Sequence, residues 1–205
     1  MKKNKISKDW LNKKKRDPFF IKSKIHGYRS RSAFKLIEMD KKFKFFKKNM
    51  AVLDLGSSPG GWSQVLKKKI NKGKILSVDI KDMEGIENID FIKGDFCEEK
   101  ILKKITLYFD GKIDLVLSDM AANTSGNKNL DSYKTGELCL NAMDLAKNIL
   151  SSEGIFLSKI FMGSIFREID KKAKKHFKKV VRYKPISSKK ESKEIYIFCK
   201  GILKI

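Results

Sequence analysis

From residue 51 onwards, short apolar runs alternate with segments of helical periodicity, and this alternation limits the possible folds more than any other feature. The apolar runs predict strands at residues 51–55, 74–80, 89–95, 113–120 and 155–161. The segments between them predict helices at residues 62–70, 97–109, 132–150 and 164–177. This order is typical of an α/β fold, a parallel sheet with helices on both faces. Two last strands, at 178–185 and 192–200, have no helix between them, so we expect a seven-stranded, mostly parallel sheet with one antiparallel strand.

The chain has 205 residues, which fits one α/β domain. We expect a basic N-terminal helical extension at residues 1–50, belonging to the same domain as the main part at residues 51–205. No apolar run approaches the roughly 18 residues of a membrane-spanning helix, and the N-terminus lacks the apolar stretch of a secretory signal. We therefore expect a cytoplasmic monomer with no membrane partner. A mitochondrial or plastid location stays open for a eukaryotic source.

The positive charge of the chain is concentrated at its two ends. Residues 1–50 carry 18 Lys/Arg against 4 Asp/Glu, and residues 167–205 carry 14 against 4. Residues 51–166 carry 15 against 16 and are nearly neutral. A general drift towards lysine would not leave the centre neutral. A neutral body with two basic flanks indicates a polyanionic partner, and nucleic acid fits best.

The cysteines and histidines do not predict a metal site. Cys97, Cys139 and Cys199 are far apart in the sequence, and neither His26 nor His176 has a partner at ligand spacing. An odd, scattered set of cysteines suits buried thiols in a reducing compartment. We expect no metal cofactor.

The segment DLGSSPGGWSQ, residues 54–64, follows the first predicted strand and precedes a helix, where ligands approach the backbone in α/β folds. A phosphate-binding P-loop would need a lysine where Trp62 stands. A dinucleotide fingerprint would need a glycine where Ser58 stands. A plain strand-to-helix turn remains open on the loop alone.

Two further strand ends carry acids that narrow the choice of ligand. Asp79 closes the second strand, where a carboxylate can accept hydrogen bonds from ribose hydroxyls. Asp95 closes the third strand, where it can receive an adenine amino group. Each alone is more often a turn or cap residue. Together with the glycine loop they favour S-adenosylmethionine, with its adenosine on the acids and its methionine part on the loop.

Candidate catalytic side chains gather at the same predicted edge of the sheet. Asp119 follows the fourth strand, and Lys159 lies within the fifth. A lysine inside a strand covered on both faces is costly unless it is paired or functional, although it can also snorkel at the sheet edge. Glu194 and Lys35, taken alone, would pass as surface residues of a strand and a helix.

Five segments resemble, in order and spacing, the FtsJ/RrmJ family of ribosomal RNA large-subunit methyltransferases. They cover nearly the whole chain and read RSRSAFKLIE, DLGSSPGGWSQ, SDMAANTSG, LSKIFMG and SKEIYIF. The resemblance implies the Rossmann-like fold of S-adenosylmethionine-dependent methyltransferases. It implies a catalytic tetrad, made of Lys35, Asp119, Lys159 and Glu194. It also implies contacts with the cofactor, which we expect at Gly56, Gly60, Gly61, Trp62, Asp79, Asp95 and Asp119.

The chain departs from the family pattern at two places. Ala122 stands where the family usually has proline, which we expect to loosen the loop beside the methyl donor. Ser57 and Ser58 replace common alanines and should be tolerated because they are small.

The expected reaction is an in-line displacement in which a ribose 2′-oxygen attacks the sulfonium methyl and releases S-adenosylhomocysteine. Positioning supplies much of the rate because the methyl group is already activated. Lys159 can act as a general base or can orient the 2′-oxygen, and the sequence leaves both roles open.

The basic flanks are the expected RNA contacts. Arg29 and Arg31 stand out in a chain with 42 lysines and 5 arginines, and arginine holds phosphate in a bidentate manner. We expect both, together with Lys35, to bind RNA. The neighbouring aromatic residues either stack on bases or pack the extension onto the body, and they are Trp10, Phe19, Phe20 and Tyr28.

The family resemblance implies a uridine in the peptidyl-transferase A-loop of large-subunit rRNA as the target, within the assembled subunit. A tRNA 2′-O-methyltransferase of the same family is an alternative reading. A non-catalytic RNA-binding factor of ribosome assembly is another, against which the complete tetrad argues.

Overall fold

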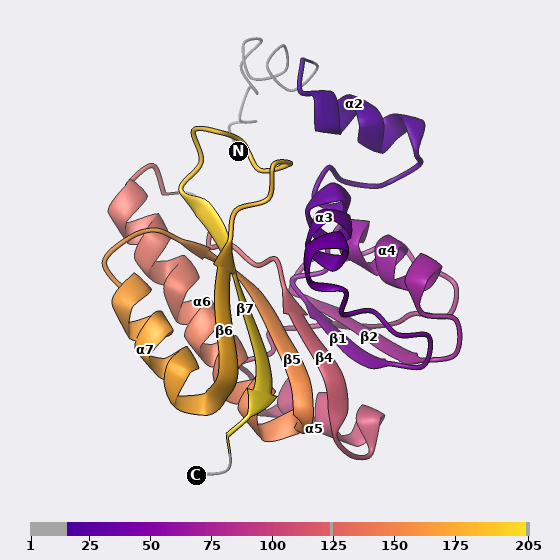
Figure 1. Cartoon of the computed structure of the whole chain (residues 1–205). Coiled ribbons are helices and arrows are strands. Elements are labelled where there is room, and N and C mark those ends of the chain that lie inside the picture. The colour runs from indigo at the N-terminus through magenta and orange to yellow at the C-terminus, as the bar shows by residue number, and fades with distance from the viewer. Residues whose placement is uncertain (1–15, 124, 204–205) are drawn as a thin grey trace, which may run out of the picture.

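A single sheet forms the centre of the computed structural model, which describes residues 16–123 and 125–203 (Figure 1). Its strands follow the order β3-β2-β1-β4-β5-β7-β6. The bounds are β1 (Ala51–Leu55), β2 (Lys74–Asp79), β3 (Asp90–Lys93), β4 (Ile113–Ser118), β5 (Leu150–Phe161), β6 (Phe177–Tyr183) and β7 (Glu194–Ile202). β7 is antiparallel to both β5 and β6, and the other pairings are parallel. The predicted seven-stranded sheet with one antiparallel strand is confirmed.

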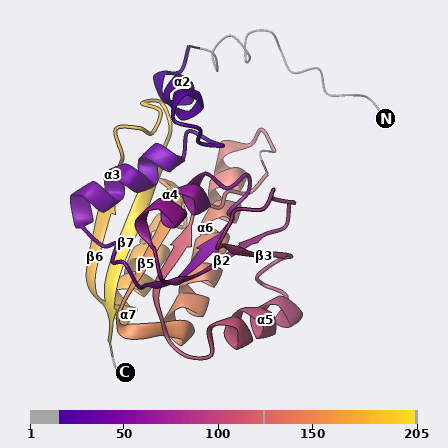
Figure 2. The ribbon, with the colours of Figure 1, turned by 90° about the vertical axis from the view of Figure 1, so that its right-hand side faces the viewer.

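Helices cover both faces of this sheet, as the two views show (Figures 1 and 2). Their bounds are α2 (Pro18–Ile25), α3 (Ala33–Phe43), α4 (Gly61–Lys69), α5 (Glu99–Phe109), α6 (Lys128–Ile149) and α7 (Phe166–His176). Helices α3 and α4 share one buried cluster with the sheet, and α5, α6 and α7 share another. Within the described ranges, no helix is both long enough and apolar enough to cross a bilayer.

The central strands β1 and β4 are mostly apolar, and nearly all of their residues are buried. In β1, Val52 packs into the cluster on the α3 side, and Leu53 packs into the cluster on the α6 side. In β5, Leu157 packs into the cluster on the α3 side, and Phe156 packs into the cluster on the α6 side. Near-continuous apolar runs are what parallel strands between two helical layers require.

Several element boundaries differ from the predicted ones for local reasons. Helix α6 begins at Lys128 rather than at residue 132, because the Asn127 side chain accepts the backbone N–H groups of Asn129 and Leu130. Strand β5 begins at Leu150, because that residue already pairs with Ile113 before a shift in register.

Residues 16–50 of the predicted N-terminal helical extension contain two helices, α2 and α3. Asp17 caps α2 by accepting the N–H groups of Phe19 and Phe20, and Pro18 occupies the first helical position. Helix α3 is integrated into the fold, since its Ala33, Leu36 and Met39 are fully buried. Residues 1–15, including Trp10, lie outside the described residues.

Two aromatic residues of this segment pack against a third on α3. The rings of Phe19 and Tyr28 lie 5.8 and 5.7 Å from the ring of Phe34 on α3. For these two side chains the contacts favour the packing alternative over base stacking.

Candidate active site

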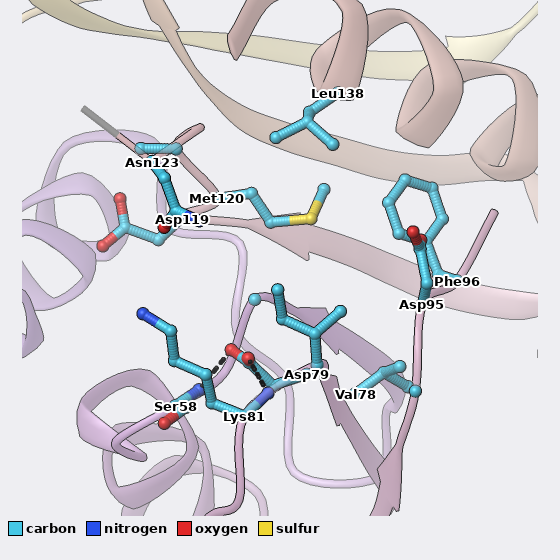
Figure 3. Close-up of a pocket in the computed structure, with 14 residues that line it drawn as sticks. Ser58, Val78, Asp79, Lys81, Asp95, Phe96, Asp119, Met120, Asn123 and Leu138 are labelled. Carbon is cyan, nitrogen blue, oxygen red and sulfur yellow. Dashed lines mark hydrogen bonds between the residues drawn. The ribbon is translucent and has the colours of Figure 1, made fainter. Parts of the chain in front are cut away.

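A pocket opens at the carboxyl ends of the parallel strands, and three acids lie along it (Figure 3). Asp79 ends β2, Asp95 follows β3, and Asp119 follows β4. In the close-up, Asp119 and Asp95 stand at opposite ends of the pocket, with Asp79 between them. Apolar side chains complete the lining, including Val78, Ile80, Phe96, Met120 and Leu138.

The glycine loop after β1 lies so close to neighbouring residues that two of its glycines have no space for a side chain. Gly56 has φ +72°, and a Cβ there would lie 2.3 Å from Met120 Cγ. Gly60 has φ +106°, and a Cβ there would lie 2.8 Å from an Arg29 nitrogen. Both positions need glycine for backbone conformation and for space.

Backbone donors fix two of the three acids. The Ser58 N–H donates to Asp79 Oδ2 at 2.9 Å, and the Lys81 N–H donates to Asp79 Oδ1 at 2.8 Å. The Cys97 N–H donates to Asp95 Oδ1 at 2.9 Å. The carboxylates are therefore held at the pocket edge before any ligand arrives.

Asp119 also belongs to a buried cluster of charged and polar groups. Lys159 Nζ lies 3.1 Å from Asp119 Oδ1 and donates to the Asp119 backbone oxygen. The Tyr196 hydroxyl donates to the same Oδ1 at 2.7 Å. Tyr196 lies opposite Lys159 in the pairing of β7 with β5, so the antiparallel strand brings both groups to one carboxylate.

A second ion pair lies beside the first. Lys35 Nζ on α3 is 2.6 Å from Glu194 Oε1 at the start of β7. The Ser188 hydroxyl donates to the same Oε1 at 2.8 Å. Lys35 also lies over the Tyr196 ring, 5.7 Å from its centroid. The structure thus brings together Lys35, Asp119, Lys159 and Glu194, the four residues of the predicted tetrad.

Charge partners determine the ionisation of this cluster. Burial acts to raise the pKa of Asp119, but the charges of Lys159 and Lys35 and the Tyr196 hydrogen bond outweigh it, so the pKa is lowered. Burial and the nearby Asp119 and Glu194 charges raise the pKa of Tyr196 well above its usual value. Asp119 is therefore an anion and Tyr196 a neutral hydrogen-bond donor at neutral pH.

Three of the predicted cofactor residues do not line the pocket. Trp62 is buried, donates from Nε1 to the Ser32 oxygen at 2.9 Å and packs near the Tyr196 ring. Gly61 lies against Ser30, and Gly60 lies against Arg29. Gly56, Asp79, Asp95 and Asp119 do line the pocket. Cofactor contacts at positions 60–62 stay predictions.

The two arginines expected to bind RNA are engaged inside the protein. Arg29 donates to the backbone oxygens of Pro59, Glu84 and Gly85 and thereby ties the glycine loop to the segment after β2. Arg31 pairs with Asp17 and donates to the Ser187 oxygen. Their contacts with RNA stay predictions.

Two residues important for the geometry were not predicted from the sequence. Tyr196 is two residues after Glu194, and strand alternation places both on one side of β7. This spacing could have indicated that Tyr196 lies near the tetrad. Glu38 accepts hydrogen bonds from the Tyr183 hydroxyl, the Ile186 N–H and both the N–H and hydroxyl of Ser187. Nothing in the sequence indicated the Glu38 contacts, because their partners lie far along the chain.

Ala122 makes a contact that proline could not make. Its N–H donates to Thr135 Oγ1 on α6 at 3.1 Å. We expected the absence of proline to loosen this loop. The hydrogen bond, which needs an N–H that proline lacks, instead fixes it.

The comparisons with known proteins decide the family. The family model described as FtsJ-like methyltransferase matches residues 28–202. The chain belongs to the FtsJ-like methyltransferase family. It is 53% identical over 200 residues to the ribosomal RNA large subunit methyltransferase E of Pelagibacter ubique, covering 98% of both chains. The family resemblance predicted from the sequence segments is confirmed.

Solved structures agree with this assignment. A ribosomal RNA methyltransferase from Plasmodium falciparum is 37% identical with a TM-score of 0.77, over 86% of this chain and 99% of that one. A Streptococcus mutans methyltransferase, solved with S-adenosylhomocysteine, is 15% identical with a TM-score of 0.55, over 80% and 96%. That more distant match shows the fold alone. The fold is that of the S-adenosylmethionine-dependent methyltransferases, as predicted.

Residues that could hold a metal are not gathered anywhere in the described chain, where no three His, Cys, Asp or Glu side chains form a candidate group. Of the three cysteines, Cys139 and Cys199 are buried as expected, whereas Cys97 is exposed.

A buried acid, Asp54, lies at the end of β1 just before the glycine loop. Its Oδ2 accepts a hydrogen bond from Ser63 on α4 at 2.7 Å, and Ser63 is 3.0 Å from the Ser77 hydroxyl on β2. Burial raises the pKa of Asp54 to about 7, the Ser63 hydrogen bond opposes this, and the charges of Asp119 and Asp79 add to it.

This pKa predicts how stability changes with pH. The folded pKa lies above the unfolded value, so the folded state binds the proton more tightly and stability falls as pH rises from about 4 to about 7. At about 1.4 kcal/mol per pKa unit, the effect amounts to a few kcal/mol. We expect the unfolding free energy of the wild type, relative to Asp54→Asn, to fall across this range in urea titrations. The variant Asp82→Asn, at an exposed site, controls for the loss of one carboxylate. A constant difference for Asp54→Asn would contradict the prediction.

Proposed function

We propose that this chain transfers the methyl group of S-adenosylmethionine to a ribose 2′-oxygen of large-subunit ribosomal RNA. The observation that carries the proposal is the double role of Asp119, which lines the pocket and pairs with Lys159. A methyl donor bound in the pocket and a ribose 2′-oxygen held by Lys159 would meet at Asp119. The P. ubique and P. falciparum relatives, both named ribosomal RNA methyltransferases, support the substrate class.

The chemistry of the pocket fits the proposed cofactor. Asp79 and Asp95 keep oxygen lone pairs for ribose hydroxyls and an adenine amino group, as expected from the sequence. Phe96, Val78 and Leu138 offer apolar surface to the adenine ring. Gly56 lets the loop lie directly against Met120, another residue of the pocket lining. When bound, the cofactor supplies an activated methyl group on its sulfonium.

Lys159 is best placed to orient the 2′-oxygen. Both of its contacts are donations, one to the Asp119 carboxylate and one to the Asp119 backbone oxygen. An ammonium has three protons, so one remains to hold the ribose oxygen in line with the methyl group. Lys35, fixed by Glu194, adds a positive charge beside the same site. These contacts fit the orienting role, and the general-base role that the sequence left open stays an alternative.

The finer target follows from the family resemblance. We propose a uridine of the A-loop in the assembled large subunit, with tRNA as the alternative within the family. Methylation of purified large subunits, free rRNA and tRNA with labelled S-adenosylmethionine, followed by mapping of the modified nucleotide, tests this. Label in the large subunit alone is the expected result. Label in tRNA alone would mean that tRNA, and not the large subunit, is the substrate. No label in any RNA would favour a non-catalytic RNA-binding factor.

Lys159→Ala tests the catalytic assignment. We expect cofactor affinity to be retained and methyl transfer to fall by at least about 100-fold, because the acceptor oxygen loses its positioning group. Calorimetry with S-adenosylhomocysteine and a single-turnover methylation assay measure the two effects. Lys103→Ala, a surface lysine on α5 paired with Glu99 and outside both basic flanks, is the matched control and should be fully active. Near-normal turnover of Lys159→Ala would rule out the assignment.

The RNA-binding proposal rests on the basic flanks. Arg31, Lys35 and Lys189 border a small depression that Glu194 also lines. Arg31 is already paired with Asp17 and the Ser187 oxygen, so Lys35 and Lys189 are the cations of this depression that we propose to contact phosphate.

RNA affinity should fall steeply with salt and depend on the N-terminal lysines. Residues 1–15 contain 7 lysines and 1 aspartate, and their deletion should weaken binding and reduce the slope of log affinity against log salt. Binding to a large-subunit rRNA fragment over a range of potassium chloride concentrations measures both. Affinity that does not change with salt would exclude phosphate contacts as its source.

A further inference from the structure

The two basic flanks, residues 1–50 and 167–205, meet on one face of the sheet. Helix α3 ends at Phe43, and the ring of Phe43 stacks on Phe198 of β7 with the centroids 4.3 Å apart. The same ring also contacts the Tyr183 ring of β6, at 5.7 Å. Figure 2 shows α3 beside these two strands. The end of α3 is therefore fixed against the strands of the C-terminal flank.

The N-terminal flank places two exposed lysines next to this aromatic contact. Lys44, the C-cap residue of α3, directly follows Phe43. Lys42 is one helical turn after Glu38, whose carboxylate accepts a hydrogen bond from the Tyr183 hydroxyl of β6. Residues four apart lie on the same face of a helix, so Lys42 is on the side of α3 that faces β6.

The C-terminal flank places two more exposed lysines on the same face of the sheet. Phe198 of β7 belongs to the buried cluster on the α3 side. Lys200 is two residues further along β7, and alternate residues of a strand share a face. Lys179 of β6 is paired directly with Lys200. Both lysines are therefore on the α3 side.

These four residues form what we call the lysine patch, made of Lys42, Lys44, Lys179 and Lys200. Within the described residues, none of their ammonium groups forms an ion pair or a hydrogen bond. Glu153 is the acid that Lys200 influences, but its carboxylate is bonded to Lys178 at 2.8 Å. Like charges directly opposite on paired strands destabilise a sheet. The pairing of Lys179 with Lys200 thus lowers the stability of the free protein, and an external anion would relieve the repulsion.

The distance between the patch and the tetrad suits a long polyanion. Lys44 is nine residues after Lys35, which is about 13 Å along a helix. Lys200 is six residues after Glu194, which is about 20 Å along a strand. An RNA carries phosphates at every nucleotide, so a single RNA with its ribose at Lys159 can also reach the patch.

We propose that the lysine patch is a second RNA-binding surface, which holds the phosphate backbone of the substrate at a distance from the methylated ribose. The inference rests on the RNA substrate of the proposed function and adds to it where that RNA runs outside the active site. Phosphate contacts fix position and orientation without reading the sequence. The patch therefore contributes affinity, and the choice of nucleotide is left to the active site.

The double variant Lys179→Gln/Lys200→Gln tests this surface. Binding of the full chain to a large-subunit rRNA fragment is measured over a range of potassium chloride concentrations. We expect binding at low salt to weaken by about three- to tenfold, and the slope of log affinity against log salt to become less steep by about one to two, because up to two phosphate contacts are lost. Lys42→Gln/Lys44→Gln, from the other flank, should have the same effect.

Two further measurements separate a lost RNA contact from a damaged structure. The affinity of Lys179→Gln/Lys200→Gln for S-adenosylhomocysteine should equal that of the wild type. Its free energy of unfolding in urea at low salt should equal or exceed the wild-type value, because the repulsion between the paired strands is removed. Lys103→Gln/Lys104→Gln is the matched control, since both lysines are exposed on α5 outside the two flanks, and it should bind RNA as the wild type does.

Wild-type affinity and an unchanged salt slope in both patch variants would overturn the proposal. A loss of binding to intact large subunits without any loss for protein-free rRNA would also overturn it, because the patch would then contact a ribosomal protein. A wild type that binds rRNA but never methylates it would overturn the proposed function and not the patch, so the two failures are distinct.

Discussion

The ion pair between Asp119 and Lys159 sets the conditions that the surrounding structure has to meet. A carboxylate in this position is largely shielded from solvent, and such shielding without partners would favour its protonated form. Lys159, Lys35 and the Tyr196 hydroxyl together keep the pKa of Asp119 low. These groups come from β5, α3 and β7, so one ionised acid at the end of β4 requires three other elements to be in place. The order of the sheet and the pairing of Tyr196 with Lys159 satisfy that requirement.

The second ion pair makes the site depend on helix α3 as well. Lys35 can reach the site only if α3 is fixed, and the burial of Leu36 and Met39 fixes its body. Glu38, one turn further on, accepts four hydrogen bonds from β6 and the segment that follows it. Those bonds outweigh the burial of the Glu38 carboxylate and lower its pKa. The segment before Glu194 is thereby held against the helix that carries Lys35.

Patterns local in sequence predicted much of this arrangement. Parallel strands end at one edge of a sheet, so Asp79, Asp95 and Asp119 could be assigned to a common pocket from their positions alone. Side chains whose role depends on distant partners could not be predicted in this way. Trp62 lies in a cofactor motif yet bonds to Ser32, and Arg29 lies in a basic flank yet holds the glycine loop.

The position of β7 has a consequence for the order in which the two halves of the site form during synthesis. The pocket residues end at Leu138, whereas the tetrad needs Glu194 and the Asp119 cluster needs Tyr196, both on a strand inserted between β5 and β6. All the pocket residues therefore leave the ribosome before the strand that carries Glu194 and Tyr196. Under the proposed function, methyl transfer to RNA requires that strand, so a copy that ends before β7 would lack part of the tetrad.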